Sequence, residues 1–247
     1  MNTLIEKLKN AHHVAVFTGA GVSTLCGIPD FRGPQGLYKQ PNADRIFDIE
    51  WFRRDPAIYY RGCAELVYGL KNYSPGPVHK ALARLEQAGV VKGIITQNID
   101  MLHQKSGSMR VYEIHGSPIL HHCFGCGCEK TFDEICTLFE QTEVPRCEHC
   151  GEAYKPDITF FGEMLPEKAF EGAIELAQRA DLLLVLGSSL TVNPAALIPP
   201  LTIRAGGEIV IINAQPTLLD DRAVLRYSDL QAFATAVQDT WPMGRQG

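Results

Sequence analysis

Four short apolar runs recur along the chain, separated by segments in which apolar residues follow a helical spacing. The runs are His13 to Thr18, Val91 to Gln97, Asp181 to Gly187 and Glu208 to Asn213. Nearly continuous apolar runs of this length are typical of strands buried on both faces, as in parallel sheets. The helical spacing is found in Pro77 to Ala88 and Pro166 to Arg179. The pattern predicts an α/β fold built on a doubly wound parallel sheet.

Small or polar residues follow each of the four predicted strands. In chain order these segments read TGAGVS, TQNID, LGSSL and INAQ. Ligands of open parallel sheets bind beyond the carboxyl ends of the strands. We therefore expect the four segments to form the rim of one ligand site.

Two stretches interrupt this alternation, and the N-terminus has a pattern of its own. Residues 30–73 are rich in aromatic and charged side chains and are expected to form a helical insert, whereas residues 123–150 carry cysteine pairs. The first residues, MNTLIEKLKNAHH, have the pattern of an amphipathic helix and lack the apolar core of a signal peptide. No apolar stretch reaches the length of a membrane span.

The composition indicates which binding partners and which cellular compartment to expect. The 247 residues are 45% hydrophobic, enough for one large domain or a domain with a smaller insert. A net charge of -5 without a long basic run argues against direct nucleic-acid binding, because phosphate contact depends on clustered Lys and Arg. We expect a cytoplasmic protein, in which the eight cysteines are metal ligands or free thiols rather than disulfides.

The cysteine pairs have the spacing of a metal site. Cys123 and Cys126 form one C-x2-C pair, and Cys147 and Cys150 form another twenty residues later. Four thiolates with this spacing predict a closed tetrahedral zinc site, structural because no position is left for water. Cys128 could replace Cys126. The nearby histidines, His121, His122 and His149, are expected to be exposed and to take no part.

The glycines after the first strand indicate a nucleotide loop, though an incomplete one. Gly19 and Gly21 would allow a tight turn whose N–H groups face a pyrophosphate at a helix N-terminus. Thr24 stands where a dinucleotide fingerprint has its third glycine. Taken alone, the two glycines could equally serve only to turn the chain.

Two further polar groups are candidates for chemistry. Gln97, Asn98 and Asp100 end the second strand, where they could bind a carboxamide or ribose hydroxyls, or could form a turn or a helix cap. His115, in EIHGS, could act as a general base because imidazole titrates near neutral pH. A structural histidine is the alternative at that position.

Taken in order, the motifs GAGVS, GIPDFRG, TQNID, IHGS, the paired C-x2-C, KPDITFFGE and LGSSL resemble those of sirtuins. Sirtuins are NAD-dependent protein lysine deacylases, and the resemblance covers nearly the whole chain; without long extensions, the chain looks like a compact prokaryotic member. It implies a Rossmann-like domain (residues 1–29, 79–118 and 156–247) with a smaller lobe. That lobe would comprise a cofactor loop and helical insert (30–78) and a zinc ribbon (119–155).

The resemblance also assigns roles to individual residues. His115 becomes the catalytic base, and Thr159, Phe161 and Val192 line the site for the acyl-lysine peptide, which would add as a strand to the extended segment from Ile158 to Phe161. The residues implied on NAD are Ala20, Gly21, Ser23, Thr24, Asp30, Phe31, Arg32, Gln97, Asn98, Ile99, Asp100, Ser188, Ser189, Asn213 and Ala214. Within this set, Phe31 would shield the reacting ribose carbon from water.

The reaction implied begins when the acyl oxygen attacks C1′ of the nicotinamide ribose and releases nicotinamide. It yields O-acyl-ADP-ribose and free lysine. Sirtuins that prefer acidic acyl groups carry Tyr-x-x-Arg in the helical insert, where this chain has Cys63 and Leu66, so acetyl and other uncharged groups are expected. NAD-dependent ADP-ribosyl transfer to protein, and a non-catalytic protein that binds NAD and zinc, remain the alternatives.

Overall fold

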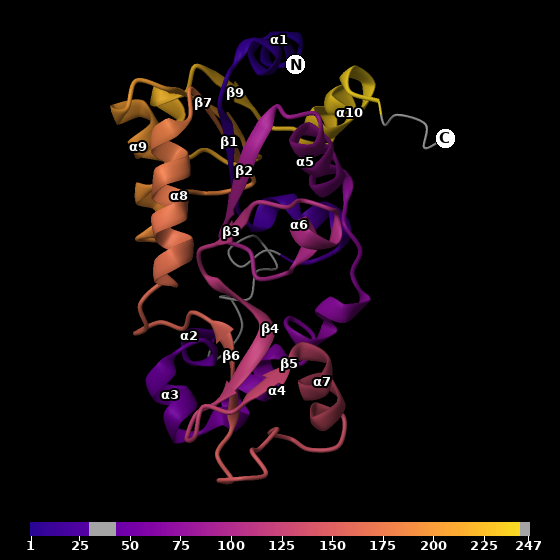
Figure 1. The fold of residues 1–247 in the computed structure, drawn as a ribbon, viewed down its shortest axis with the longest axis vertical. Helices are drawn as coiled ribbons and strands as arrows, with labels where there is room; N and C mark the ends of the chain where they lie inside the picture. The colour runs from indigo at the N-terminus through magenta and orange to yellow at the C-terminus, as the bar shows by residue number, and fades with distance from the viewer. Residues whose placement is uncertain (30–42, 243–247) are drawn as a thin grey trace.

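The computed structural model describes residues 1–29 and 43–242. Asp30, Phe31 and Arg32 lie outside the described residues. The two ends of the molecule differ in architecture: a six-stranded sheet flanked by helices occupies one end, and a smaller lobe lies at the other, away from the N-terminal helix (Figure 1).

The large sheet is parallel throughout and contains the four predicted strands. Its order is β3 (Val111–Glu113), β2 (Val91–Thr96), β1 (Val14–Thr18), β7 (Leu182–Leu186), β8 (Glu208–Ile212) and β9 (Leu225–Tyr227). Counted along the chain within this sheet, the order is 3-2-1-4-5-6, which is the Rossmann arrangement. The predicted fold class is confirmed. The strand order reverses between β1 and β7, which is where such sheets bind ligands.

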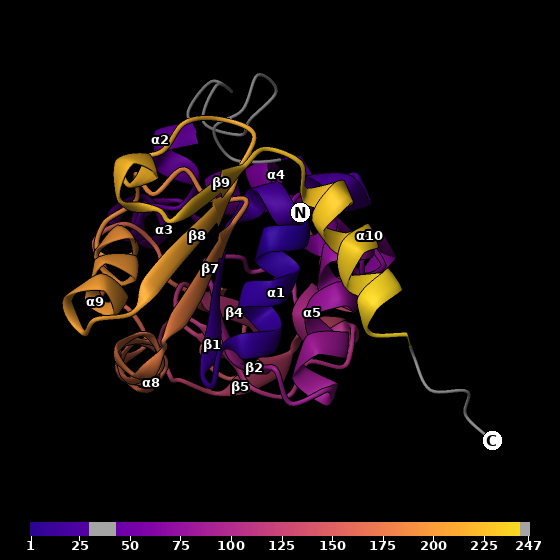
Figure 2. The ribbon, with the colours of Figure 1, turned by 90° about the horizontal axis from the view of Figure 1, so that it is seen from above.

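Helices cover both faces of this sheet (Figure 2). One face carries α8 (Glu167–Arg179) and α9 (Pro199–Arg204), and the other carries α1 (Asn2–Asn10), α5 (Pro77–Gln87) and α10 (Leu230–Thr240). Alternate residues of each strand serve the two layers: Val14 and Val16 pack on the α1 side, whereas Ala15 and Phe17 pack on the α8 side. This double burial explains why the strands read as continuous apolar runs.

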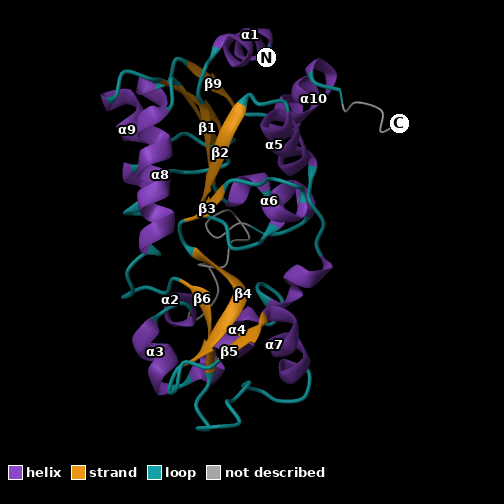
Figure 3. Cartoon of the chain, viewed as in Figure 1, coloured by secondary structure: helices purple, strands orange, loops and turns teal. Residues whose placement is uncertain are grey.

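The smaller lobe combines a three-stranded antiparallel sheet with short helices, most of which come from an earlier part of the chain (Figure 3). Its sheet has the order β5 (Glu129–Thr131), β4 (Gly116–Cys123) and β6 (Tyr154–Ile158). Its helices are α2 (Ala43–Ile46), α3 (Ile49–Arg54), α4 (Pro56–Cys63), the 3-10 segment η4 (Tyr68–Asn72) and α7 (Phe132–Phe139). The described part of the insert is thus helical, as predicted.

Local sequence signals set the ends of these helices. The Asp48 carboxylate accepts hydrogen bonds from two amides of the first turn of α3, and Asp55 does the same for one amide of α4, where Pro56 takes the first helical position. Thr131 and Glu134 form a capping box at the start of α7. None of the helices among the described residues combines the length and the apolar character that a membrane crossing requires.

Candidate active site and thiol cluster

A cavity of about 1050 Å³ lies between the carboxyl ends of the parallel strands and the residues that follow β6. Its volume lies just above the range of about 300–1,000 Å³ typical of ligand pockets. All four predicted rim segments contribute to the wall. The predicted site residues that line it are Ala20, Gly21, Thr24, Gln97, Asn98, Ile99, His115, Thr159, Phe161, Ser188, Ser189, Val192, Asn213 and Ala214.

Two predicted site residues, Ser23 and Asp100, lie behind the wall and are nearly inaccessible to solvent. Ser23 Oγ donates a hydrogen bond to Asp100 Oδ2 at 2.6 Å, and the Leu102 amide donates to Asp100 Oδ1 at 2.9 Å. Asp100 therefore closes the turn before α6 (Leu102–Lys105), which is one of the two roles that the sequence left open. From this position it also holds the Ser23 hydroxyl.

The two glycines of the nucleotide loop are required by a close backbone approach. A Cβ on Gly21 would lie 2.7 Å from Gly187 Cα, and one on Gly19 would lie 2.8 Å from the Gly187 carbonyl oxygen. The loops after β1 and β7 thus pack backbone to backbone at the point where the strand order reverses. No side chain larger than hydrogen fits there without moving one of the loops.

The amides of the two glycines themselves have partners within the fold. The Gly19 amide donates to Leu186 O at 3.0 Å and the Gly21 amide donates to Gly187 O at 2.9 Å, so both are engaged within the fold. The loop also leads into two 3-10 segments, η1 (Ala20–Val22) and η2 (Thr24–Cys26), where an α-helix N-terminus was expected. The glycines bring the two loops together, and any contact with phosphate must come from other groups.

His115 follows β3 and lines the cavity, and one of its ring nitrogens has a hydrogen-bond partner. Its Nδ1 lies 2.9 Å from the Gln97 carbonyl oxygen, which can only accept, so Nδ1 carries the proton in the neutral ring. The other nitrogen, Nε2, then has the lone pair. This arrangement fixes both the tautomer and the orientation of the imidazole, as a general base requires.

The amide side chains after β2 are held by neighbouring loops. Gln97 Nε2 donates to Ser188 Oγ at 2.8 Å, which joins the β2 and β7 loops. Asn98 Nδ2 donates to the Gly19 carbonyl oxygen at 3.1 Å and to Ser23 Oγ at 3.3 Å, which joins the β2 and β1 loops. Asn98 is 5% exposed, so this side chain is fixed in the wall and is not a mobile surface group.

The segment after β6 is extended only in part, and its amides have partners. The strand ends at Ile158; the amides of Thr159, Phe160 and Phe161 then donate to His115 O, the Glu163 carboxylate and Phe47 O. These three amides are therefore not open for pairing with an added strand, and peptide addition to this segment stays a prediction. The following residues, 162–165, all line the cavity.

Lys155 and Glu163 hold this segment in place, and neither was predicted from the sequence as a site residue. Lys155 Nζ lies 2.9 Å from Glu163 Oε2, donates to Ile158 O at 2.9 Å and sits 4.2 Å from the centre of the Phe160 ring. Burial lowers the pKa of Lys155, opposed by the Glu163 carboxylate. The KPDITFFGE motif contains both charges, so opposite charges flanking an aromatic pair could have revealed them.

Met164 and Leu165 also line the cavity, and they were missed because they carry no obvious chemistry; Met164 is 93% exposed at the rim. Asn193, Phe160 and Gln215 contribute to the wall as well, the last two from segments that were expected at the site. Within the described part of the wall there is no lysine or arginine, whereas Glu163 and other acidic residues are present. The described part of the cavity wall thus offers no Lys or Arg cation to a distal carboxylate.

The residues of the helical insert that bear on acyl preference do not line the cavity. Cys63 is fully buried in the small lobe and Leu66 packs against the same core. The nearby Tyr60 hydroxyl donates to the Tyr154 carbonyl oxygen at 2.6 Å, and Arg61 pairs with Glu143 on the surface. Tyr60 and Arg61 are thus engaged in holding the small lobe together.

A pair of buried histidines lies next to the site but outside the cavity wall. His103 Nε2 is 3.0 Å from Thr18 Oγ1, and the rings of His79 and His103 are 4.8 Å apart. Burial lowers the pKa of His103 well below its ordinary value, and the nearby His79 lowers it further. Burial also lowers the pKa of His79, so both rings are neutral near pH 7.

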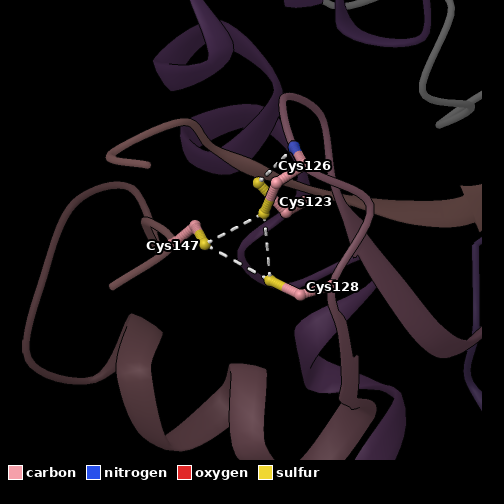
Figure 4. Close-up of side chains that lie close together, drawn as sticks. All are labelled: Cys123, Cys126, Cys128 and Cys147. Atoms are coloured by element: carbon pink, nitrogen blue, oxygen red, sulfur yellow. Dashed lines mark hydrogen bonds between the residues drawn. The ribbon is translucent and has the colours of Figure 1, made fainter. Parts of the chain in front are cut away.

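Four cysteines of the small lobe gather in one cluster (Figure 4). All eight cysteines of the chain are free thiols. Cys123, Cys126, Cys128 and Cys147 place their sulfurs within 4.8 Å of one another. The predicted ligand Cys150 also belongs to the cluster, since its sulfur is 3.3 Å from that of Cys123. The structure thus gathers the four predicted ligands and adds Cys128, which the sequence offered only as a substitute.

The donor set fits zinc. Four sulfurs at 2.3 Å from one ion in tetrahedral geometry lie about 3.8 Å apart, and neighbouring sulfurs of the cluster lie 3.3 to 3.6 Å apart. Backbone amides of Cys126 and His149 donate to Cys123 Sγ and Cys147 Sγ, as in the outer contacts of thiolate sites. Compact, hydrogen-bonded thiols of this kind suit a closed structural site.

Two of the neighbouring histidines are not the exposed groups that the sequence suggested. His121 is fully buried, with Nε2 3.2 Å from the Tyr68 hydroxyl, and burial lowers its pKa to about 3. His122 is half-buried and its Nδ1 lies 2.7 Å from Asp157 Oδ1. His149 is exposed, as predicted. The alternation of β4 turns His121 toward the aromatic core, which the histidine pair in the sequence did not reveal.

Comparison with known proteins gives consistent matches over the chain. The model of the Sir2 family matches residues 19–194. An NAD-dependent protein deacetylase of Thermotoga maritima is 42% identical over 240 residues, which are 97% of each chain. An NAD-dependent protein deacylase 2 of Archaeoglobus fulgidus is 43% identical over 216 residues, covering 87% of this chain and 85% of the relative.

Solved structures match over the same extent. A Sir2 structure with a p53 peptide and NAD+ has a TM-score of 0.91 and 40% identity, covering 99% of both chains. Sir2Tm bound to a propionylated peptide has a TM-score of 0.90 and 38% identity, again covering 99% of both chains. The similarity therefore includes both the large sheet and the smaller lobe.

Proposed function

This chain belongs to the Sir2 family, and we propose that it removes acetyl groups from protein lysines while consuming NAD. The products are nicotinamide, O-acyl-ADP-ribose and free lysine. The observation that carries this proposal is the placing of His115, whose Nδ1–H is bound by Gln97 O and whose ring lines the cavity. A relative with a similar structure binds a p53 peptide together with NAD+.

NAD is assigned to the sheet side of the cavity. Support comes from the close packing of the loops after β1 and β7 and from the polar side chains of Asn98, Ser188 and Asn213 beside them. When bound, NAD supplies an electrophilic ribose carbon from which nicotinamide departs. The residues implied on NAD by the family motifs are retained in this assignment, including Asp30, Phe31 and Arg32, with Ser23 and Asp100 supporting from behind the wall.

The chain's own groups position the reactants and move a proton. His115 Nε2 accepts a proton from a ribose hydroxyl, because Nδ1 is already protonated and held by Gln97 O. Asn98 and Gln97 keep their amides oriented through the hydrogen bonds to the neighbouring loops. The apolar walls, including Phe161 and Val192, exclude water from the acyl-lysine, which limits premature hydrolysis.

The acyl group is acetyl or another uncharged chain. The described cavity wall has no cation and carries Glu163, so a succinyl or malonyl carboxylate would be desolvated without a partner. Sir2Tm, a structural relative, binds a propionylated peptide. Thr159, Phe161 and Val192 are assigned to the walls around the acyl-lysine side chain.

The small lobe holds one structural zinc ion through its thiols, and the protein acts in a reducing compartment, which we assign as the cytoplasm. All eight cysteines are unpaired, which a zinc–thiolate site requires. The predicted absence of nucleic-acid binding stays a prediction that rests on the net charge of -5.

The function is tested by weighing the products of acyl peptides incubated with and without NAD. The peptide should lose the mass of one acetyl group only with NAD, propionyl should also be removed, and succinyl should remain. Gain of an ADP-ribosyl mass on the protein or peptide with the acetyl group retained would favour ADP-ribosyl transfer. Binding of NAD without release of nicotinamide would show a non-catalytic protein.

A further inference from the structure

We propose that Arg226 is a positioning residue for NAD, because its guanidinium holds the loop between β8 and β9 that forms one end of the cavity wall. Arg226 lies on β9, the edge strand beside β8 (Figure 2). The loop begins at Asn213, Ala214 and Gln215, and all three line the cavity. The inference rests on the proposed function, which assigns NAD to the sheet side, and it names a residue behind the wall that sets the affinity for NAD.

The guanidinium makes contacts at both ends of this loop. Arg226 Nη2 donates to Gln215 O at 2.8 Å, and Nε donates to Asp220 Oδ2 at 3.1 Å. Nη1 donates to Tyr227 O within β9. These acceptors belong to the start of the loop, to its 3-10 segment η6 (Asp220–Arg222) and to the strand itself. The planar fork of donors therefore joins the start of the loop to a strand that lies eleven residues further along the chain.

Asp220 is itself fixed, which gives the guanidinium a second support. Its Oδ1 accepts a hydrogen bond from Thr217 Oγ1 at 2.7 Å, while Oδ2 faces Arg226. Burial raises the pKa of Asp220, but hydrogen bonds from Thr217 and Arg226 outweigh it and hold the pKa below its ordinary value. The carboxylate is thus charged near neutral pH. The two side chains of the pair are 27% and 25% exposed, so salt screens this pair less than a fully exposed one.

The Gln215 carbonyl connects this ion pair to the cavity. Its oxygen also accepts a hydrogen bond from Asn213 Nδ2 at 2.8 Å. Because a carbonyl oxygen can only accept, this contact fixes the orientation of the Asn213 amide and leaves Oδ1 as its acceptor for a ligand hydroxyl. Ala214, Gln215 and Pro216 are exposed, so hydrogen bonds rather than packing hold this part of the loop. Displacement of Gln215 O would therefore release Asn213.

The strand order places this loop away from the reacting end of NAD. His115 and Gln97 follow β3 and β2, whereas β1 and β7 separate β2 from β8. With neighbouring strands about 4.8 Å apart, the carboxyl ends of β2 and β8 are about 14 Å apart. The β8 loop therefore contacts the half of NAD that is remote from nicotinamide. Contacts there bind ground state and transition state alike, so loss of Arg226 should raise KM for NAD and leave kcat unchanged.

The test measures binding and turnover by the full-length protein and three single variants. In Arg226→Met, the calorimetric affinities for NAD and for ADP-ribose, which lacks nicotinamide, should both weaken about tenfold, as expected for loss of a charged hydrogen-bonding group. KM for NAD should rise by a similar factor, with kcat and KM for the acetyl peptide unchanged. Arg226→Lys should recover part of the affinity, because an ammonium keeps the charge beside Asp220 but cannot span three acceptors. Arg222→Met, which removes an exposed cation from the same loop, is the matched control and should bind as wild type does.

Wild-type affinity in Arg226→Met would overturn the proposal, as would an equal loss of affinity in Arg222→Met. A fall in kcat, or a rise in peptide KM, as large as the change in NAD affinity would reveal general damage to the fold and would also overturn it. Binding is measured apart from turnover, so weaker binding by Arg226→Met supports the proposal even where acetyl peptides are not cleaved, which would contradict the proposed deacetylation alone. A wild-type protein that binds neither NAD nor ADP-ribose would contradict both.

Discussion

The parallel sheet and the small lobe are filled by different kinds of side chain. The layers on both faces of the sheet consist mainly of valine, leucine, isoleucine and alanine. The small lobe is filled by aromatic rings and thiols; Tyr59, for example, contacts Phe47, Phe52 and Phe160 within one cluster of rings. Edge-on aromatic packing supplies much buried area with few residues.

This difference has consequences for stability and for the site. The large sheet buries whole strands on both faces. The lobe has short helices and a three-stranded sheet, and small cores of this kind are commonly completed by a metal or disulfides. The cavity lies where the two regions meet, so its sheet wall and its β6 wall should respond differently to the same perturbation.

Removal of zinc should have the largest effect, and the loss of stability should be confined to the lobe. Structural zinc contributes about 10–16 kcal/mol in small zinc domains. Chelation is therefore expected to abolish hydrogen-exchange protection in β4, β6 and α7 while β1, β7 and β8 stay protected. Equal loss in both regions would show that the lobe does not fold separately, and unchanged protection would show that it needs no metal.

On the sheet side, Gly21→Ala should be the more severe of two glycine changes. The new methyl group would lie 2.7 Å from Gly187 Cα, which forces the loops after β1 and β7 apart at a cost of about 1–3 kcal/mol. Thermal unfolding and calorimetric NAD binding should both weaken. Gly69→Ala is the control in the lobe, since its methyl group would meet nothing within 4 Å; equal effects of the two changes would contradict the close-packing account.

Lys155→Met tests the segment that links the two regions. Loss of its hydrogen-bonded charge should cost about 2 kcal/mol and loosen residues 158–163, which carry Thr159 and Phe161. KM for the acyl peptide should rise while KM for NAD changes little, and Lys155→Arg should recover part of the loss. Lys168→Met, at an exposed position on α8, should change neither constant. A rise in both KM values after Lys155→Met would show that the segment also supports the NAD wall.

The smallest effect expected is the pH dependence that His103, on the sheet side, gives to the free energy of unfolding. Because the folded pKa of His103 is lowered, the unfolded chain takes up the proton first as pH falls below about 6.5, and the free energy of unfolding falls with it. Between pH 7 and pH 5.5, wild type should lose about 1 kcal/mol more than His103→Gln in urea unfolding. The same loss in both proteins would assign the pH dependence to other groups.

The sequence predicted the sheet region better than the lobe, for physical reasons. Strands buried on both faces leave continuous apolar runs, so all four central strands were found, whereas the edge strands β3 and β9 have only three residues each and left no comparable signal. The aromatic stretch predicted a helical insert. The packing of its rings depends on contacts between residues far apart in sequence, which no local pattern carries. The proposed domain boundaries stay predictions.

The candidate site was predicted in its residues and less well in its contacts. The identity and order of the motifs predicted the site residues, and fourteen of them line the cavity. The occupied amides of Gly21 and Phe161 were not foreseen, because a hydrogen-bond partner is set by tertiary approach and not by residue type. The same holds for His121, which the pleat of β4 directs inward, and for Cys128, which the turn brings into the thiol cluster.

The most direct test of the central claim is the stoichiometry of the reaction at His115. Nicotinamide and deacetylated peptide should appear in equal amounts when the purified protein is incubated with NAD and an acetyl-lysine peptide, and His115→Ala should form neither at a comparable rate while still binding zinc. Deacetylated peptide formed without NAD, or formed at the wild-type rate by His115→Ala, would contradict the account.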